Sequence, residues 1–296
     1  MFGPHVSRYH AAGKRPSIVA HIKAARQEAA DAAGFSVTAV ALFVGGPKNR
    51  EITLTKQERS ELRTYIRDQE LVVIAHSSYA ASPWKGDPNA AAYIREELSV
   101  CQEAGIAGLV VHLPKQPIDV VMRYIARLIN TDAPDVRIYM ETPAVNPRAT
   151  YYETPKKLAK LFAAIRKDLD PNLDVFGLCV DSAHLWTCGI DLQSYEAANQ
   201  WLNALEEVAS VIPADRVMIH LNDSLLPLGV GPDAHAPLAQ GKIWVDYVSR
   251  IDKSGLMAFT DYAQRHDTPV ILERKPKEAL IGDYQLLRTM VPRTKP

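Results

Sequence analysis

Residues 174–186 read DVFGLCVDSAHLW, a mostly apolar run followed by Asp181 and His184 with only small residues between them. The run has the length and composition of a strand buried in a parallel sheet that helices cover on both faces. Folds of this kind place their active-site residues at the carboxyl ends of the strands. The stretch therefore predicts both a fold class and the position of a site.

Seven more short apolar segments resemble this one. They span 1–6, 37–44, 71–75, 107–111, 136–140, 216–220 and 269–272. Helix-length stretches with apolar residues three and four apart lie between them, at 55–69, 89–105 and 195–212. Eight strand–helix units at a spacing of roughly 35 residues favour a (β/α)8 TIM barrel, with an open doubly wound sheet as the alternative. We expect one domain over residues 1–296, with its active site at the C-terminal rim of the strands.

The composition is that of an ordinary globular protein, with 47% hydrophobic and 23% charged residues. No apolar run approaches the length of a membrane span, and the first residues, MFGPHVSRYH, lack the pattern of a signal peptide. We therefore expect an intracellular protein that does not bind membranes. Three cysteines without CxxC spacing indicate buried or reduced thiols and argue against a disulfide framework or a thiolate zinc site.

Charge is distributed unevenly along the chain, although the net charge is zero. Residues 1–68 carry eleven Lys and Arg against six Asp and Glu, and residues 274–296 carry six against two. The zero net charge by itself argues against a nucleic-acid partner. The two basic segments are compatible with phosphate contacts and equally with solvated helix faces.

Side chains that bind metal ions stand at six consecutive predicted strand ends and in the loop before the last strand. In chain order they are His76, His112, Glu141, Asp181, His184, His220, Asp233, His235 and Glu273. A barrel would bring all nine to one rim. Imidazole and carboxylate ligands suit Zn²⁺, Mn²⁺ or Fe²⁺, and nine groups exceed the needs of one ion. Several ions close together are a recurring device of phosphoryl-transfer chemistry.

The segments GLCVDSAHLW (177–186), HLND (220–223) and ILER (271–274) resemble motifs of the endonuclease IV family of apurinic/apyrimidinic (AP) endonucleases. The likeness covers nearly the whole chain and is greatest to a viral member of the family. It implies a zinc-dependent enzyme of base excision repair on a TIM barrel, which hydrolyses the phosphodiester 5′ to an abasic site and leaves a 3′-hydroxyl. It also allows 3′-end processing or 3′–5′ exonuclease activity.

The resemblance further implies three zinc ions, a duplex DNA partner containing an abasic site, and a monomer. If the protein is viral, the compartment is host cytoplasm, nucleus or virion. The implied ligands of the first ion are His76, His112 and Glu141. Glu141 would bridge to a second ion, whose other ligands are Asp181, His220 and Glu273. The third ion would be held by His184, Asp233 and His235. The residues expected to be catalytic are Glu141, Asp181 and Glu273, and His5 is expected to pack beneath the site.

DNA contacts are implied at two places. Tyr79 follows His76 at the spacing H-x-x-Y, where the family places a ring in the minor groove. The next residue is Ala80, where the family usually has a larger apolar side chain, and Trp84 is a candidate to compensate. The loop GGPKNRE (45–51) is the second place, and its candidate residues are Lys48, Asn49 and Arg50.

Two other functions fit part of this pattern. A single-metal sugar isomerase or epimerase of the same barrel superfamily would use Glu141, Asp181, His220 and Glu273. It would not need the remaining ligands, His76, His112, His184, Asp233 and His235, and these favour the endonuclease. A non-catalytic DNA- or metal-binding barrel would keep the whole rim without cleaving DNA.

Overall fold

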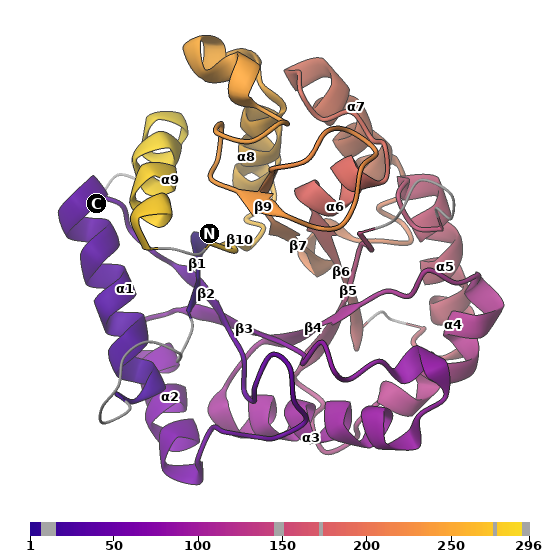
Figure 1. Ribbon diagram of the computed structural model, residues 1–296. Helices are drawn as coiled ribbons and strands as arrows, with labels where there is room; N and C mark the ends of the chain where they lie inside the picture. Colours follow the sequence, from indigo (N-terminus) through magenta and orange to yellow (C-terminus); the bar gives the residue numbers. More distant parts are fainter. Residues whose placement is uncertain (7–15, 145–150, 172–173, 275–276, 292–296) are drawn as a thin grey trace.

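The computed structural model describes residues 1–6, 16–144, 151–171, 174–274 and 277–291. Eight parallel strands close into a barrel in the order β1-β10-β7-β6-β5-β4-β3-β2 (Figure 1). They are β1 (Phe2–Val6), β2 (Ala39–Leu42), β3 (Val72–His76), β4 (Gly108–His112), β5 (Arg137–Glu141), β6 (Phe176–Asp181), β7 (Val217–His220) and β10 (Val270–Leu272). Each predicted segment overlaps one barrel strand, although β3, β4 and β5 end one residue later than predicted, and the predicted TIM barrel is confirmed.

Helices surround the barrel (Figure 1). The α-helices are α1 (Ile18–Ala33), α2 (Lys56–Asp68), α3 (Pro88–Ala104), α4 (Ile118–Ile125), α5 (Pro155–Asp168), α6 (Ser182–Thr187), α7 (Tyr195–Glu207), α8 (Gly255–Arg265) and α9 (Lys277–Met290). Short 3-10 helices are η1 (Pro83–Lys85), η2 (Ala126–Leu128), η3 (Ala214–Arg216) and η4 (Val245–Lys253). The predicted helices at 55–69 and 89–105 are confirmed as α2 and α3, whereas the helix predicted over 195–212 ends at Glu207.

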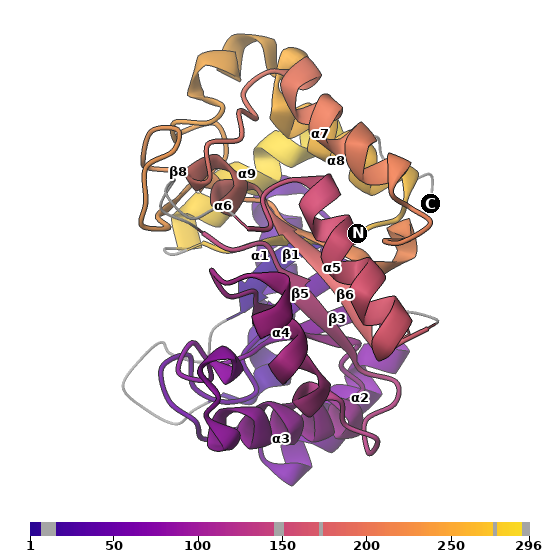
Figure 2. The same cartoon turned by 90° about the vertical axis from the view of Figure 1, so that its right-hand side faces the viewer.

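A short antiparallel pair lies outside the barrel. Its strands are β8 (Asp223–Ser224) and β9 (His235–Ala236), and Ser224 pairs with His235. Figure 2 shows β8 and α6 together on one side of the molecule. This pair brings the loop after β7 back over the strand ends, so His235 returns to the site that His220 begins.

The start of α2 illustrates how local sequence sets an element. Thr55 caps the helix by accepting a hydrogen bond from the Glu58 backbone N–H, and the Glu58 side chain accepts from the Thr55 N–H in return. Such a capping box satisfies two backbone donors that a helix end leaves unpaired. Leu62 is the fully buried residue of α2, so this helix lies against the barrel along a narrow apolar stripe.

The side chains of each barrel strand belong alternately to two cores, because successive side chains of a strand point to opposite faces. The inner cluster fills the barrel and consists of Ala39, Ala41, Ile74, Val110, Tyr139, Cys179, Met218 and Ile271. The intervening strand residues, such as Val73, Leu109 and Ile138, belong to the larger core that the helices cover. The interior is thus a packed core, as in other TIM barrels.

Cys101, Cys179 and Cys188 are all buried, and none forms a disulfide. The expectation of buried thiols is confirmed. Among the described residues, no helix combines the length and apolar character needed to cross a membrane.

Candidate metal centre

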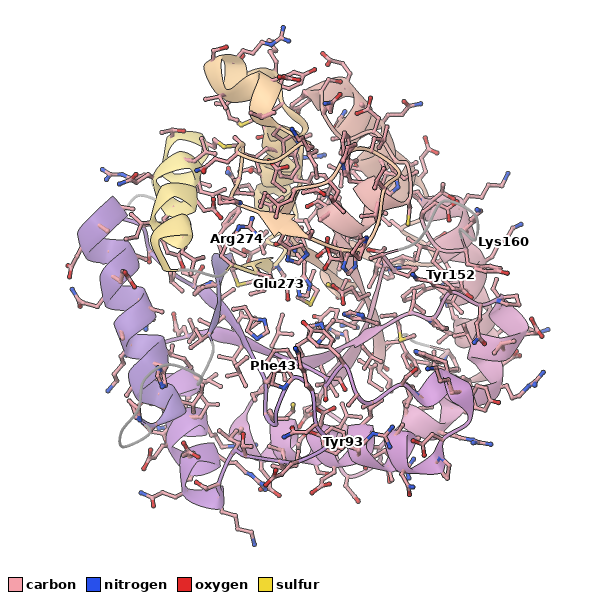
Figure 3. The ribbon with its side chains drawn as sticks, in the orientation of Figure 1. Phe43, Tyr93, Tyr152, Lys160, Glu273 and Arg274 are labelled. Atoms are coloured by element: carbon pink, nitrogen blue, oxygen red, sulfur yellow. The ribbon has the colours of Figure 1, made fainter. Side chains whose placement is uncertain are left out.

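The predicted ligands continue the inward-facing rows of the barrel. His76 follows the interior residue Ile74 by two positions, and His112 follows Val110 in the same way. The same offset holds for Glu141, Asp181, His220 and Glu273, which follow Tyr139, Cys179, Met218 and Ile271. Because strand side chains alternate with period two, these six point into the barrel just above its apolar filling. Figure 3 shows Glu273 near the centre of the ring.

Strand register places the ligands next to one another. Across neighbouring strands His112 is paired with Glu141, and Asp181 with His220. Residues in register on parallel strands share a face and lie at the same height. The strands alone therefore place imidazole and carboxylate groups next to one another at the rim, without any residue from a loop.

The first cluster joins His76, His112 and Glu141. Nε2 of His112 lies 2.7 Å from Oε2 of Glu141 and 3.2 Å from Nε2 of His76, which is 3.4 Å from the same oxygen. Oε2 of Glu141 is buried, and the approach of His112 does not have hydrogen-bond geometry. A buried carboxylate oxygen needs a partner of positive charge, which a cation among these three atoms would supply. The cluster therefore fits a metal ion.

Two histidines are oriented by backbone carbonyls. Nδ1 of His76 donates to the Ser77 carbonyl at 2.7 Å, and Nδ1 of His184 donates to the Thr142 carbonyl at 2.6 Å. A carbonyl only accepts, so each Nδ1 carries a hydrogen and Nε2 is the nitrogen available to a metal. Histidine ligands in proteins are usually oriented in this way.

The second cluster contains Glu141, Asp181, His220 and Glu273, whose ligand atoms lie within 4.8 Å of one another. Nδ1 of His220 is 2.7 Å from Oε1 of Glu141, 3.4 Å from Oε2 of Glu273 and 3.9 Å from Oδ2 of Asp181. The two oxygens of Glu141 thus face different clusters. Glu141 is therefore shared by the first and second clusters.

Local helix chemistry explains the spacing of Asp181 and His184. Asp181 is the N-cap of α6, and its Oδ1 accepts a hydrogen bond from the His184 backbone N–H at 2.8 Å. The cap needs a residue three positions later with its N–H turned back toward Asp181, which puts the His184 side chain on the first turn of α6. Ser182 and Ala183 are buried in this turn.

The third cluster is formed at the loop side of the rim. Ligand atoms of Asp181, His184 and His235 lie within 4.8 Å of one another. Asp233 is also present, with Oδ1 2.9 Å from Nε2 of His235 and Oδ2 3.4 Å from Nε2 of His184. The structure thus brings the implied set of His184, Asp233 and His235 together and adds Asp181 beside it.

Neighbouring charges at the rim shift the pKa values of Glu141 and His184 in opposite directions, whereas burial raises the pKa of Asp181. Burial raises the pKa of Glu141, but the neighbouring His112 and His220 outweigh it and hold the pKa well below its usual value. Burial lowers the pKa of His184, but Asp181, Glu141 and Asp233 outweigh it and raise the pKa well above its usual value. In the absence of metal these groups pair as carboxylate and imidazolium. Metal ions would take the place of the imidazole protons.

Cys179 lies near this group but belongs to the apolar filling of the barrel, two positions before Asp181 on β6. Its thiol is close to the ligand atoms of Glu141 and His220, and burial raises the pKa of the thiol to about 12.

The segments with the predicted DNA contacts border the first cluster. The Tyr79 side chain is 55% exposed, and its ring centre lies 5.2 Å from that of His76 and 5.5 Å from that of His112. Lys48, Asn49 and Arg50 are exposed on a neighbouring loop. The Tyr79 N–H donates to the Pro47 carbonyl at 2.9 Å, which ties the two loops together.

Arg50 has partners within the protein. Its Nη1 lies 2.6 Å from Oδ2 of Asp87, and its Nε and Nη2 donate to the Ala80 carbonyl at 3.1 and 3.0 Å. Arg50 therefore clamps the loop that carries Tyr79. Contact with DNA stays a prediction for this residue.

Trp84, the candidate to compensate for Ala80, is buried and does not face the DNA side of the loop. The side chain is 5% exposed, and its indole N–H donates to the His112 carbonyl at 2.8 Å. A ring packed in the core with its polar atom satisfied cannot enter a DNA groove without unfolding η1. Trp84 supports the strand end of His112, so the prediction that it contacts DNA disagrees with the structure.

A cavity of about 350 Å³ opens beside the first cluster. Its lining includes His76, Tyr79, Lys85, His112 and Lys115. A larger cavity of about 830 Å³ lies away from the strand ends, between α1 and α2. Only the smaller one combines the predicted ligands with cationic side chains among the described residues.

Sequence reasoning misplaced one residue of the centre and missed two. His5 was expected beneath the site but lies in the ligand layer, with Nδ1 3.5 Å from Oε1 of Glu273. Phe43 follows the interior residue Ala41 by two positions, and its ring packs 4.7 Å from that of His5. The period-two rule would have found both. Asn222 had no such signal, since its amide reaches the centre from the loop after β7.

A family model for the xylose isomerase-like TIM barrel matches residues 27–288. The chain belongs to this family. The probable AP endonuclease of African swine fever virus (isolate Tick/Malawi/Lil 20-1/1983) is 36% identical over 266 residues, which cover 87% of this chain and 88% of that protein. The resemblance seen in the sequence is thereby confirmed.

Two solved structures are similar to this chain over nearly its whole length. The crystal structure of AsfvAP:AG matches with a TM-score of 0.91 at 34% identity and covers 98% of each chain. Endonuclease IV from Thermus thermophilus matches with a TM-score of 0.73 at 23% identity, again over 98% of each chain. At that lower identity the second likeness shows the fold alone.

Proposed function

We propose that this protein is an AP endonuclease that uses metal ions to hydrolyse the phosphodiester 5′ to an abasic site in duplex DNA, leaving a 3′-hydroxyl. The observation that carries the proposal is the set of three His and carboxylate clusters at one rim, joined through Glu141 and Asp181. The name of the viral relative, a probable AP endonuclease that is 36% identical, supports it. Nine converging groups exceed the needs of one ion.

We assign three Zn²⁺ ions to the clusters, with Mn²⁺ or Fe²⁺ as possible substitutes. When bound, such ions supply an activated water nucleophile and neutralise charge on the attacking and leaving oxygens of the phosphodiester. The first ion would be held by His76, His112 and Glu141. The second would be held by Glu141, Asp181, His220 and Glu273, and the third by His184, Asp233 and His235. The catalytic residues would be Glu141, Asp181 and Glu273.

The protein's own residues prepare the rim for this reaction. The carboxylate of Glu141 stays ionised at neutral pH because neighbouring imidazoles lower its pKa. Carbonyl contacts at Nδ1 aim the Nε2 atoms of His76 and His184 into the centre. Ligands held in this way need little rearrangement when metal and DNA bind.

DNA would approach over the exposed loops around the first cluster. Lys48 is exposed, and Lys85 and Lys115 line the cavity next to His112. Lysines at such positions attract the phosphate backbone and make binding dependent on salt. The exposed ring of Tyr79 would enter the minor groove at the lesion, where unstacking is least costly. Arg50 would hold the Tyr79 loop in place through the Ala80 carbonyl.

A single-metal sugar isomerase is the second candidate, because the family also carries the xylose isomerase name. Glu141, Asp181, His220 and Glu273 alone would satisfy that reaction. His76 and His112 converge on the outer oxygen of Glu141, which a one-ion site does not require. The geometry of the first cluster therefore favours the endonuclease.

Two measurements test the proposal. Metal analysis should find about three ions per chain, as nine ligands at three clusters require. A duplex with one abasic analogue should be nicked 5′ to the lesion, and an unmodified duplex of the same sequence should stay intact. Chelation should abolish nicking and added Zn²⁺ should restore it. About one ion per chain together with an intact abasic duplex would refute the endonuclease and support the isomerase.

A further inference from the structure

A buried ion pair lies behind the clusters, on the side of α9. Nε of Arg274 is 2.7 Å from Oδ2 of Asp283, and the two side chains are 2% and 0% exposed. Asp283 belongs to α9, and its Oδ1 accepts a hydrogen bond from the Leu238 N–H at 2.7 Å. Figure 3 places Arg274 beside Glu273, on its α9 side. Burying two charges costs about as much as their attraction returns, so such a pair is weak evidence for stability.

The same guanidinium contacts Asn222. Nη1 of Arg274 donates to Oδ1 of Asn222 at 2.6 Å, and the Glu273 backbone N–H donates to that oxygen at 3.2 Å. Arginine has donors only, so the side-chain atom that it contacts has to be the amide oxygen. Arg274 thereby decides which way the amide of Asn222 faces.

The amide nitrogen of Asn222 then faces the ligands. Nδ2 donates to Oδ2 of Asp181 at 2.6 Å and lies 3.2 Å from Oε2 of Glu273, which also accepts from it. Asn222 is fully buried, so water does not replace these contacts. A flipped amide would put its oxygen against two carboxylates, which is repulsive.

We propose that Arg274, held by Asp283, is a positioning residue of the metal centre. It locks the amide of Asn222, and Asn222 in turn fixes the orientation in which Asp181 and Glu273 meet the ions. This inference rests on the proposed function, because it assumes a metal-loaded rim. Asp283 neutralises the guanidinium, so the centre is oriented without an uncompensated positive charge that would repel cations. Because its side chain is only 2% exposed, Arg274 does not reach DNA.

The test compares Arg274→Lys with Leu287→Ala. Lysine keeps the charge but lacks the planar fork that contacts Asn222 and Asp283 together. Leu287 is buried on α9, so its truncation weakens the packing of the same helix without touching the network. Zn²⁺ affinity is measured by competition with a chromophoric chelator, and kcat and KM are measured on a duplex with an abasic analogue.

For Arg274→Lys we expect Zn²⁺ affinity and kcat to fall by about 10- to 100-fold, the range typical of residues that orient metal ligands, while KM stays unchanged. For Leu287→Ala we expect a lower melting temperature with wild-type affinity and kcat. Wild-type affinity in Arg274→Lys would overturn the inference. An equal loss of affinity in both variants would do the same, since it would show that docking of α9 is what matters.

A second variant covers the case in which Arg274→Lys does not fold. Asp283→Asn preserves the shape of the pair and leaves the guanidinium uncompensated, so Zn²⁺ affinity should again fall, and unchanged affinity would overturn the inference. Wild-type protein that binds Zn²⁺ but leaves abasic duplex intact would refute the proposed function, and the affinity comparison would still decide the positioning role. Wild-type protein without Zn²⁺ affinity would refute both.

Discussion

Glu97 on α3 is a buried carboxyl whose ionisation should destabilise the folded protein. Its side chain is 1% exposed and accepts hydrogen bonds from Ser77 Oγ at 2.5 Å and from the Ser78 N–H at 3.2 Å. Burial raises its pKa from the ordinary value of 4.5 to about 7, although the hydrogen bonds from Ser77 and Ser78 oppose the rise. These contacts hold the start of the loop that carries Tyr79.

The sign and size of the effect follow from the two pKa values. The folded state binds the proton more tightly than the unfolded state between pH 4.5 and about 7. The contribution of Glu97 to stability is therefore fully present below pH 4.5 and is lost as the pH rises through 7. A shift of this size corresponds to about 3 kcal/mol in total, of which about 2.5 kcal/mol falls between pH 5 and pH 8.

The assay is urea unfolding of the wild type, Glu97→Gln and Glu96→Gln at pH 5 and pH 8. Glutamine stands in for the protonated acid, since its oxygen can accept from Ser78 and its amide can donate to Ser77. Relative to the wild type, Glu97→Gln should gain about 2 to 3 kcal/mol on going from pH 5 to pH 8. Glu96 is the exposed neighbour on α3, and its variant should follow the wild type. Parallel pH profiles for the wild type and Glu97→Gln would refute the reasoning.

Three other predictions concern the proposed metal centre and the proposed DNA contact. Glu141→Gln and Glu273→Gln should each lower the rate of nicking of an abasic duplex by orders of magnitude, because each variant loses a charged ligand. Their circular dichroism spectra should match that of the wild type, because no core contact is removed. Wild-type nicking rates would show that the ligand assignment is wrong. Lys48→Ala should weaken binding to duplexes of every sequence and reduce by about 1 the slope of log binding constant against log salt concentration. Lys160→Ala, on the outer helix α5, should change neither quantity, and filter-binding titrations of both variants measure this. Acidification should release metal. Burial lowers the pKa of His220, but Cys179, Glu273 and Glu141 outweigh it and raise the pKa well above its usual value, so protons compete with the ions as the pH falls. Equal metal content after dialysis at pH 8 and pH 5 would contradict this last prediction.

Much of the centre could be predicted because its rules are local. Strand periodicity and the two-residue offset from interior residues such as Ile74 and Met218 are visible in the sequence, and they point His76 and His220 into the barrel. The capping requirement of α6 explains the spacing of Asp181 and His184 just as locally. For these residues, chemistry and direction follow from positions a few residues apart.

Other features depend on how distant segments meet. Trp84 was a candidate to compensate for Ala80 at the DNA lesion, but its ring is buried against the strand end of His112, and Arg50 clamps the Tyr79 loop. The role of Asn222 depends on Arg274, which is far from it in the sequence but contacts it once β10 lies beside β7. Sequence alone therefore determined the barrel, the types of the proposed ligands and their inward direction. Only the closed tertiary structure decided which ligands share a cluster and what holds them, because those contacts arise from strand register and loop packing, which no local pattern encodes.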